Sequence, residues 1–170
     1  NMNKTGYFGS ERDGGFAEYT TTPAQNALSV QSVLSDSELA TFSCSYSTAE
    51  GMLTRAQVSR ADTVLVPGAS GGVGSALVQL AKRRGARVIA MTSHAKHKEV
   101  DALGPDKILH RTPNNLRGAL GNEKITVVAD IVGGPYWPTL IDIIERGGRY
   151  TCSGALAGPM VDRDLRPLYL

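Results

Sequence analysis

From residue 64 onward, short apolar runs alternate with stretches in which apolar residues recur every three or four positions. The short runs are rich in β-branched residues, as in strands, and the periodic stretches have one apolar side, as in amphipathic helices. The predicted strands are 64–66, 87–91, 107–109, 125–132 and 149–152, and the predicted helices between them are 73–84, 96–103, 114–120 and 137–146. This alternation predicts an α/β, doubly wound fold, a parallel sheet with helices on both faces.

Two local details support this prediction. In the first helix Val73, Leu77, Leu80 and Ala81 form one apolar stripe. Glycines punctuate the predicted helix ends: Gly85 follows the first, Gly104 the second, and Gly147 with Gly148 the fourth.

The residues before 64 do not show this alternation of apolar runs and helical patterns. Residues 16–22 combine aromatic and β-branched residues and stop at Pro23, which predicts a strand, and residues 27–30 predict a second short one. Ser35 and Asp36 predict a helix start that leads to one or two helices through residue 56. We place a domain boundary near residues 32–43.

Composition and charge limit the function classes. The 170 residues are 41% hydrophobic and 20% charged, with a formal charge of +2, which is typical of a globular protein. The basic cluster 82–84 has no interleaved aromatic residues, so we expect no nucleic-acid partner. No apolar run approaches 18 residues and the first residues do not show the charged-then-apolar pattern of a leader, so we expect neither secretion nor a membrane span. Cys44 and Cys152 match no metal or redox spacing, which favours reduced thiols in the cytoplasm.

A glycine-rich motif lies between the first predicted strand and helix. Its central residues are Ala69, Ser70, Gly71, Gly72, Val73 and Gly74. Ala69, Gly71 and Gly74 take the three glycine positions of the dinucleotide fingerprint, with alanine replacing the first. The motif needs a tight turn, a bare backbone for pyrophosphate and a close contact between helix and strand. Phosphate would then lie at the helix N-terminus, where free N–H groups favour an anion.

The residues after the second predicted strand bear on the choice of nucleotide. NAD sites usually carry Asp or Glu there to bind the ribose hydroxyl, and this sequence has none. Ser93 offers a hydrogen bond and Lys96 a charge, which suits a 2′-phosphate and favours NADP(H) over NAD(H). The alternative is that Lys96 and Lys98 are ordinary exposed charges.

These motifs together resemble the medium-chain dehydrogenase/reductases, the zinc-containing alcohol dehydrogenase-like and quinone oxidoreductase-like enzymes. The resemblance is carried, in order, by 15–19 with Pro23, 44–49, 64–74, 79–81, 85–86, 130–134, 147–150 and 153–154. It covers nearly the whole chain.

The resemblance implies an oxidoreductase that passes a hydride between nicotinamide and a small-molecule carbonyl, enone or quinone substrate. It implies that residues 1–34 are the C-terminal part of an incomplete GroES-like catalytic β domain. Residues 35–170 would be an NAD(P)-binding Rossmann domain whose last strand is missing beyond residues 164–170. We therefore expect nucleotide binding without useful turnover by this chain, and a homodimer is a candidate assembly.

The resemblance also assigns cofactor-binding roles by position. Gly71, Gly72, Val73 and Gly74 would face the pyrophosphate, and Ser93 with Lys96 the adenosine phosphate. Arg111 would lie near adenine, and Thr48 would contact the nicotinamide end, although a surface charge and a helix residue are equal alternatives for these two. The nicotinamide side would be lined by Val132, Gly133, Gly134, Ser153, Gly154 and Ala155.

Cys44 is the residue that bears on a metal site. In zinc-dependent members the position of Cys44 is a zinc ligand, so the resemblance leaves zinc possible in the parent enzyme. The other ligands would lie upstream of residue 1, and we therefore expect no metal in this chain; packing is the alternative role of Cys44. Cys152 is expected in the core.

No catalytic residue is identified. Short-chain dehydrogenases are excluded because no tyrosine has a lysine four residues later. The alternative function is a non-catalytic nucleotide-binding module, a redox sensor or a partner-binding domain.

Overall fold

The computed structural model describes residue 6 and residues 8–162. The chain separates into two compact units, Asn1–Ser35 and Asp36–Leu170, and each is described by itself. The expected last strand beyond residues 164–170 lies outside the described residues. None of the described helices is both long and apolar enough to cross a membrane.

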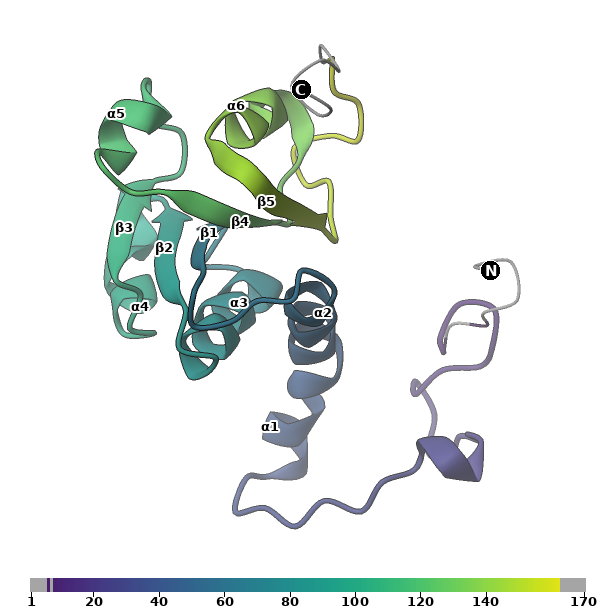
Figure 1. Ribbon diagram of the computed structural model, residues 1–170. Helices are drawn as coiled ribbons and strands as arrows, with labels where there is room; N and C mark the ends of the chain where they lie inside the picture. Colours follow the sequence, from purple (N-terminus) through teal and green to yellow (C-terminus); the bar gives the residue numbers. More distant parts are fainter. Residues whose placement is uncertain (1–5, 7, 163–170) are drawn as a thin grey trace. The chain divides into compact units, whose positions relative to one another are not determined.

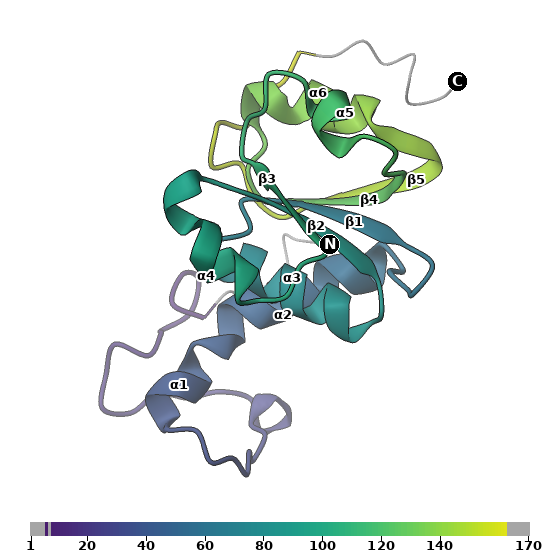
Figure 2. The ribbon, with the colours of Figure 1, turned by 90° about the vertical axis from the view of Figure 1, so that its left-hand side faces the viewer.

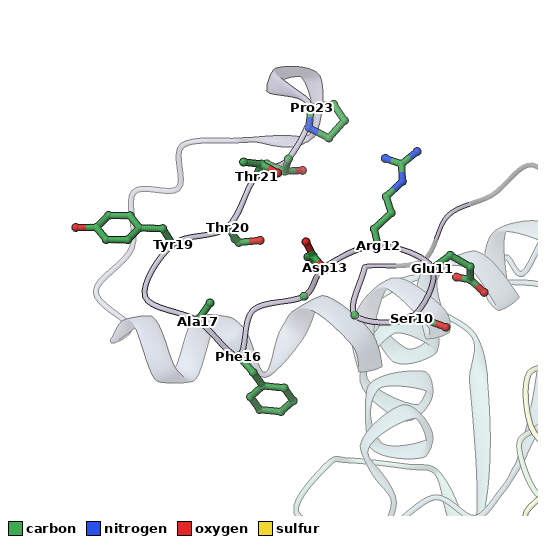
Figure 3. Close-up of a pocket in the computed structure, with 13 residues that line it drawn as sticks. Ser10, Glu11, Arg12, Asp13, Phe16, Ala17, Tyr19, Thr20, Thr21 and Pro23 are labelled. Carbon is green, nitrogen blue, oxygen red and sulfur yellow. The ribbon is translucent and has the colours of Figure 1, made fainter.

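The described part of the first unit contains turns, bends and one short 3₁₀ helix, η2 (Ala24–Asn26). The prediction of strands at 16–22 and 27–30 was wrong. A strand is held by hydrogen bonds to a neighbouring strand, and the pairing within the described part of this unit is one isolated bridge between Phe8 and Arg12. Residue preferences for strands are a weak guide without a partner. Figure 3 shows the loop of residues 9–23, in which the rings of Phe16 and Tyr19 point away from the hollow it surrounds.

The second unit is built on one all-parallel sheet. Its described strands have the order β3-β2-β1-β4-β5. The strands are β1 (Thr63–Pro67), β2 (Arg87–Thr92), β3 (Lys107–His110), β4 (Ile125–Asp130) and β5 (Ile144–Cys152). The chain runs outward from β1 through β2 and β3, and then returns to the other side of β1 with β4. The doubly wound α/β prediction is confirmed.

Helices cover both faces of this sheet. They are α1 (Asp36–Ala40), α2 (Phe42–Arg55), α3 (Gly72–Arg83), η3 (His94–Lys96), α4 (His97–Asp101), α5 (Leu116–Leu120), η4 (Gly134–Tyr136) and α6 (Trp137–Asp142). Figures 1 and 2 show α2, α3 and α4 on one face of the sheet, and α5 and α6 on the other.

The side chains of β1 to β4 divide between two cores. Val64 and Val66 of β1 join the core under α2 and α3, whereas Leu65 points to the core under α5 and α6. Successive side chains of a strand point to opposite faces, so a strand buried on both faces is apolar throughout, as the short apolar runs predicted. The burial of β1 explains why its sequence reads as a continuous apolar run.

Three predictions for the region from β4 to β5 were wrong. The last helix ends at Asp142 rather than at 146, because the chain enters β5 at Ile144 and the strand passes through the two glycines that were predicted to end the helix. Gly147 has φ +75, and a Cβ at Gly148 would lie 2.4 Å from the Ile144 side chain. The second feature is β4, which ends two residues early, at Asp130. The third is Cys152, which is exposed rather than part of the core, because β5 lies at the edge of the described sheet.

A buried polar cluster ties the loop before β1 to the sheet. The carboxylate of Asp62 accepts hydrogen bonds from the Ser59 backbone N–H (2.8 Å) and the Thr126 hydroxyl (2.8 Å), and it pairs with the Arg149 guanidinium. Burial alone would raise the pKa of Asp62, but the Ser59 and Thr126 hydrogen bonds and the charge of Arg149 outweigh it and lower the pKa. The cluster therefore stabilises the ionised carboxylate.

We expect the Asp62 cluster to make the stability of the chain sensitive to acid. Because the pKa of Asp62 is lowered by folding, its contribution is present above the unfolded value, near 3.8, and is lost as the pH falls through the folded value. Asp62→Asn should lower the free energy of unfolding at pH 7 by about 1.5–3 kcal/mol. Its stability should then fall less steeply below pH ~4.

Urea denaturation of both proteins at pH 7, 5, 4 and 3 tests this expectation. Asp101→Asn, an exposed change on α4, is the control. The same acid dependence in Asp62→Asn and in the unmodified chain would contradict it.

Candidate nucleotide-binding site

The candidate site lies at the carboxyl edge of the sheet. The chain leaves β1 toward β2 and leaves β4 toward β5, so the loops after β1 and β4 part in opposite directions. In open α/β sheets such a point opens a crevice where ligands bind. A cavity of about 560 Å³ is found there. Its lining is Pro67, Gly68, Ser70, Met91, Thr92, Ser93, Arg111, Thr112, Val132, Gly133, Pro135, Tyr136, Leu140, Leu156 and Ala157.

The lining is mostly apolar, with one charge. Arg111 is the charged residue among the described residues that line the cavity, and no carboxylate joins it there. Burial raises the pKa of Tyr136, another lining residue, so its phenol is neutral at ordinary pH. The cavity therefore favours a ligand with an apolar ring and a negative charge.

The turn between β1 and α3 leaves the start of the helix uncapped. Gly68 turns the chain with φ +69, and its carbonyl accepts the N–H of Gly71 at 3.1 Å. Gly71 is the N-cap of α3 and no side chain caps the helix. Since a helix leaves its first N–H groups without internal partners, those of the first turn are available to an anion.

The three glycines of this motif meet different constraints. A Cβ at Gly74 would lie 2.1 Å from the carbonyl oxygen of Gly68, so the approach of α3 to β1 requires glycine. A Cβ at Gly72 would lie 2.6 Å from the Ser45 hydroxyl oxygen. Gly71 has an ordinary φ of −81, and a Cβ there would lie 3.6 Å from its nearest neighbour, a normal contact. The packing of the described chain therefore does not explain glycine at position 71.

A buried hydroxyl without a partner faces the cavity from the end of β2. Thr92 is 3% exposed, it lines the cavity, and its Oγ1 has no hydrogen-bond partner among the described residues. Buried polar groups are nearly always hydrogen-bonded, so this atom needs a partner that the described chain does not supply. Sequence reasoning named the neighbouring Ser93 and missed Thr92. Its position as the last residue of a buried strand was the available signal.

The structure separates the two basic residues expected near the adenosine end. Arg111 lines the cavity and its backbone N–H donates to the Thr92 carbonyl at 2.8 Å, which brings it beside Thr92 and Ser93. Lys96 is outside the described lining and forms an exposed ion pair with Glu99, with an N···O distance of 2.9 Å. Exposed pairs of this kind are weak.

The residues expected on the nicotinamide side form two adjoining loops. The Val132 carbonyl accepts the N–H of Ala157 at 2.8 Å. A Cβ at Gly134 would lie 2.4 Å from the Ala157 carbonyl oxygen, and one at Gly154 would lie 2.6 Å from that of Ile131. The loops after β4 and β5 therefore pack backbone against backbone. Val132 and Gly133 also line the cavity, whereas Gly134, Ser153, Gly154 and Ala155 are outside its described lining.

The remaining expected residues are also outside the described lining of the cavity, and these include Gly71, Gly72, Val73 and Gly74 of the glycine-rich motif. Ala69 is buried behind the turn, and the half-buried Thr48 lies on α2. Cys44, on the same helix, is exposed rather than packed. Among the described residues, no three His, Cys, Asp or Glu side chains are grouped to hold a metal ion. The described donor set does not fit zinc, and we derive no step through it.

Comparisons with known proteins show the family of this chain. Residues 72–170 match the family model described as zinc-binding dehydrogenase. A protein from Sinorhizobium meliloti, provisionally named an alcohol dehydrogenase, has a solved structure that is 48% identical with a TM-score of 0.90. That match covers 96% of this chain and 46% of that one.

Two further matches agree with this family. Acryloyl-coenzyme A reductase from Metallosphaera sedula is 31% identical over 142 residues, which are 84% of this chain and 42% of that protein. A mycobacterial structure complexed with NADPH is 28% identical with a TM-score of 0.73, covering 82% of this chain and 44% of that one. This chain spans less than half the length of each of these three proteins. It belongs to the zinc-binding dehydrogenase family of the medium-chain dehydrogenase/reductases, as its motifs predicted.

Proposed function

We propose that the second unit binds NADP(H) for an oxidoreductase that transfers a hydride to or from a carbonyl, enone or quinone-type substrate. The observation that carries the proposal is the bare turn at Gly71, which directly follows Ser70 of the cavity lining and begins a helix without a side-chain cap. Glycine there has no reason within the described packing, and close approach of a pyrophosphate supplies one. When bound, NADP(H) supplies the hydride chemistry, and the residues of this chain bind and orient it.

The residues divide the dinucleotide between them. The backbone of Ser70 and of residues 71–74 binds the pyrophosphate, assisted by the dipole of α3. Thr92, Ser93 and Arg111 bind the adenosine end. The loops at 132–134 and 153–155 hold the nicotinamide end, with Thr48 beside it.

The preference for NADP(H) rests on the charge at the adenosine end. A carboxylate would repel a 2′-phosphate, and none lines the described cavity, whereas Arg111 offers a guanidinium that can bind phosphate with two hydrogen bonds. The NADPH complex of the mycobacterial relative supports the same cofactor. Lys96 can add its charge from outside the lining once it exchanges Glu99 for phosphate.

We propose a cytoplasmic location for the protein, because Cys44 and Cys152 are both free thiols.

Thr92→Val tests whether the unpartnered hydroxyl is kept for a ligand. Replacing it by a methyl group of similar shape should raise the free energy of unfolding of the free chain by about 1 kcal/mol, since it removes an unsatisfied buried group. The same change should weaken NADPH binding about fivefold to tenfold, because one hydrogen bond to the ligand is lost.

Thermal unfolding and calorimetric titration measure the two effects. The control is Thr126→Val, which removes a hydroxyl already bonded to Asp62 and should lower stability with unchanged NADPH affinity. Unchanged NADPH affinity in Thr92→Val would contradict the role of this hydroxyl.

A pair of glycine variants tests the proposed pyrophosphate turn. Gly71→Ala should change the free energy of unfolding by less than about 1 kcal/mol, because its φ and surroundings accept a Cβ. It should nevertheless weaken NADPH binding at least about tenfold. Gly74→Ala should cost about 3 kcal/mol of stability, because its Cβ would overlap the Gly68 carbonyl.

Urea unfolding and titration with NADPH report on both variants. A Gly71→Ala protein that binds NADPH as tightly as the unmodified chain would show that no ligand approaches this turn.

A further inference from the structure

Asp130, at the end of β4, has a buried carboxylate that accepts hydrogen bonds from the residues that follow the strand. It is 0% exposed. Its Oδ1 accepts the backbone N–H of Val132 at 2.7 Å, and the N–H of Gly133 lies 3.2 Å from Oδ2 and 3.3 Å from Oδ1. A buried charge is costly unless hydrogen bonds compensate it. Here the compensating donors are two consecutive N–H groups of the loop at the cavity.

These hydrogen bonds hold the loop in a conformation that favours glycine. Gly133 has φ 60 and ψ −148, and Gly134 follows with φ +69. The carboxylate turns the chain away from the strand direction at this point, which is why β4 ends two residues before the predicted end. Val132 and Gly133 then become part of the cavity lining.

The same carboxylate also reaches the strand that leads to the second loop. The phenol of Tyr150, on β5, donates to Asp130 Oδ2 at 2.6 Å. Burial and this hydrogen bond raise the pKa of Tyr150, so the phenol keeps its proton. The ring of Trp137 packs edge-on against that of Tyr150, with 5.8 Å between centroids.

Backbone hydrogen bonds also link the loop after β4 to the loop after β5. The Ser153 N–H donates to the Asp130 carbonyl at 3.1 Å, and the Ala157 N–H donates to the Val132 carbonyl at 2.8 Å. Asp130 and Tyr150 thus set the spacing of the two loops that close one side of the cavity.

We infer that Asp130 and Tyr150 form a positioning pair, which fixes the loops at 132–134 and 153–157 in the arrangement that receives the nicotinamide-riboside half of the dinucleotide. The inference rests on the proposed function and extends it to a specific half of the ligand. Neither side chain needs to touch the ligand. They act through the backbone of the two loops. Neither side chain is hydrogen-bonded to Thr92 or Arg111 in the described structure, so we expect the adenosine end to be affected less than the nicotinamide end.

Two probes separate this role from a general structural one. NADPH engages both halves of the site, whereas 2′,5′-ADP engages only the adenosine and phosphate half. Calorimetric titration of the whole chain with each probe gives the ratio of their affinities. Asp130→Ala should bind 2′,5′-ADP within about twofold of the unmodified chain and NADPH at least about tenfold more weakly, because two backbone N–H groups lose a charged acceptor.

Conservative variants and a matched control complete the test. Asp130→Asn keeps one acceptor oxygen and should recover most of the NADPH affinity. Tyr150→Phe keeps the ring and its packing, and should show a smaller loss confined to NADPH. Asp62→Ala removes another buried carboxylate that makes no contact with either loop in the described structure, and should lower stability while leaving the affinity ratio unchanged.

The outcomes separate the inference from the proposed function. Equal losses of both probes in Asp130→Ala would mean a purely structural role and overturn the inference. Equal affinity of the unmodified chain for the two probes would mean that the loops do not receive nicotinamide, which also overturns it but leaves the nucleotide site in place. Binding of neither probe by the unmodified chain would overturn the proposed function itself. If Asp130→Ala fails to fold, Tyr150→Phe decides, and an unchanged ratio there overturns the inference.

Discussion

The contact between Gly74 of α3 and the carbonyl of Gly68 is the constraint on which the rest of the site depends. A Cβ at residue 74 would lie 2.1 Å from that oxygen, so the helix can rest on the end of β1 only because this position has no side chain. The contact sets where α3 begins, and therefore where its uncapped N–H groups lie. Gly71 is exposed at the start of this helix and directly follows Ser70, which lines the cavity. The nucleotide site that we propose at this place therefore depends on the packing of one helix on one strand.

Two buried carboxylates, Asp62 and Asp130, stabilise the sheet, one away from the cavity and the other beside it. Asp62 ties the loop before β1 to β4 and β5 through Thr126 and Arg149, away from the cavity lining. Asp130 ends β4 at the cavity and holds the loop that lines it. Both are compensated by several hydrogen bonds, as buried charges must be. The first contributes to stability, and we assign the second to the arrangement of the site.

The sequence predicted the parts of the fold that local patterns determine. The apolar runs of β1 to β4 and the stripe on α3 report burial directly, because a strand or helix buried on a known face needs apolar residues at a fixed period. The strands predicted at 16–22 and 27–30 failed because a strand requires a partner, which residue preferences do not reveal. The glycines at 147 and 148 were taken for a helix end, although they belong to an irregular strand.

The candidate site was predictable where backbone geometry dictates residue type. Gly74 was predicted because a close contact between helix and strand needs glycine, and the structure shows that contact. Gly71, whose surroundings accept a Cβ, stays a prediction that rests on the approach of a phosphate. Thr92 was missed because an unpartnered hydroxyl is visible only when its surroundings are known. Lys96 was favoured over Arg111 because it is close to β2 in the sequence, whereas Arg111 comes to the cavity from the neighbouring strand β3. The surroundings of Thr92 and of Arg111 both depend on the pairing of β2 with β3, which the sequence does not reveal.

Calorimetric titration of the chain with NADPH and NADH under the same conditions tests the central claim most directly, with Arg111→Ala and Lys96→Ala as variants. The account predicts that NADPH binds at least about tenfold more tightly than NADH. Arg111→Ala should abolish this preference, and Lys96→Ala should reduce it by a smaller factor, because the lysine lies outside the described lining and is paired with Glu99. Equal or tighter binding of NADH, or a preference that survives in Arg111→Ala, would contradict the account.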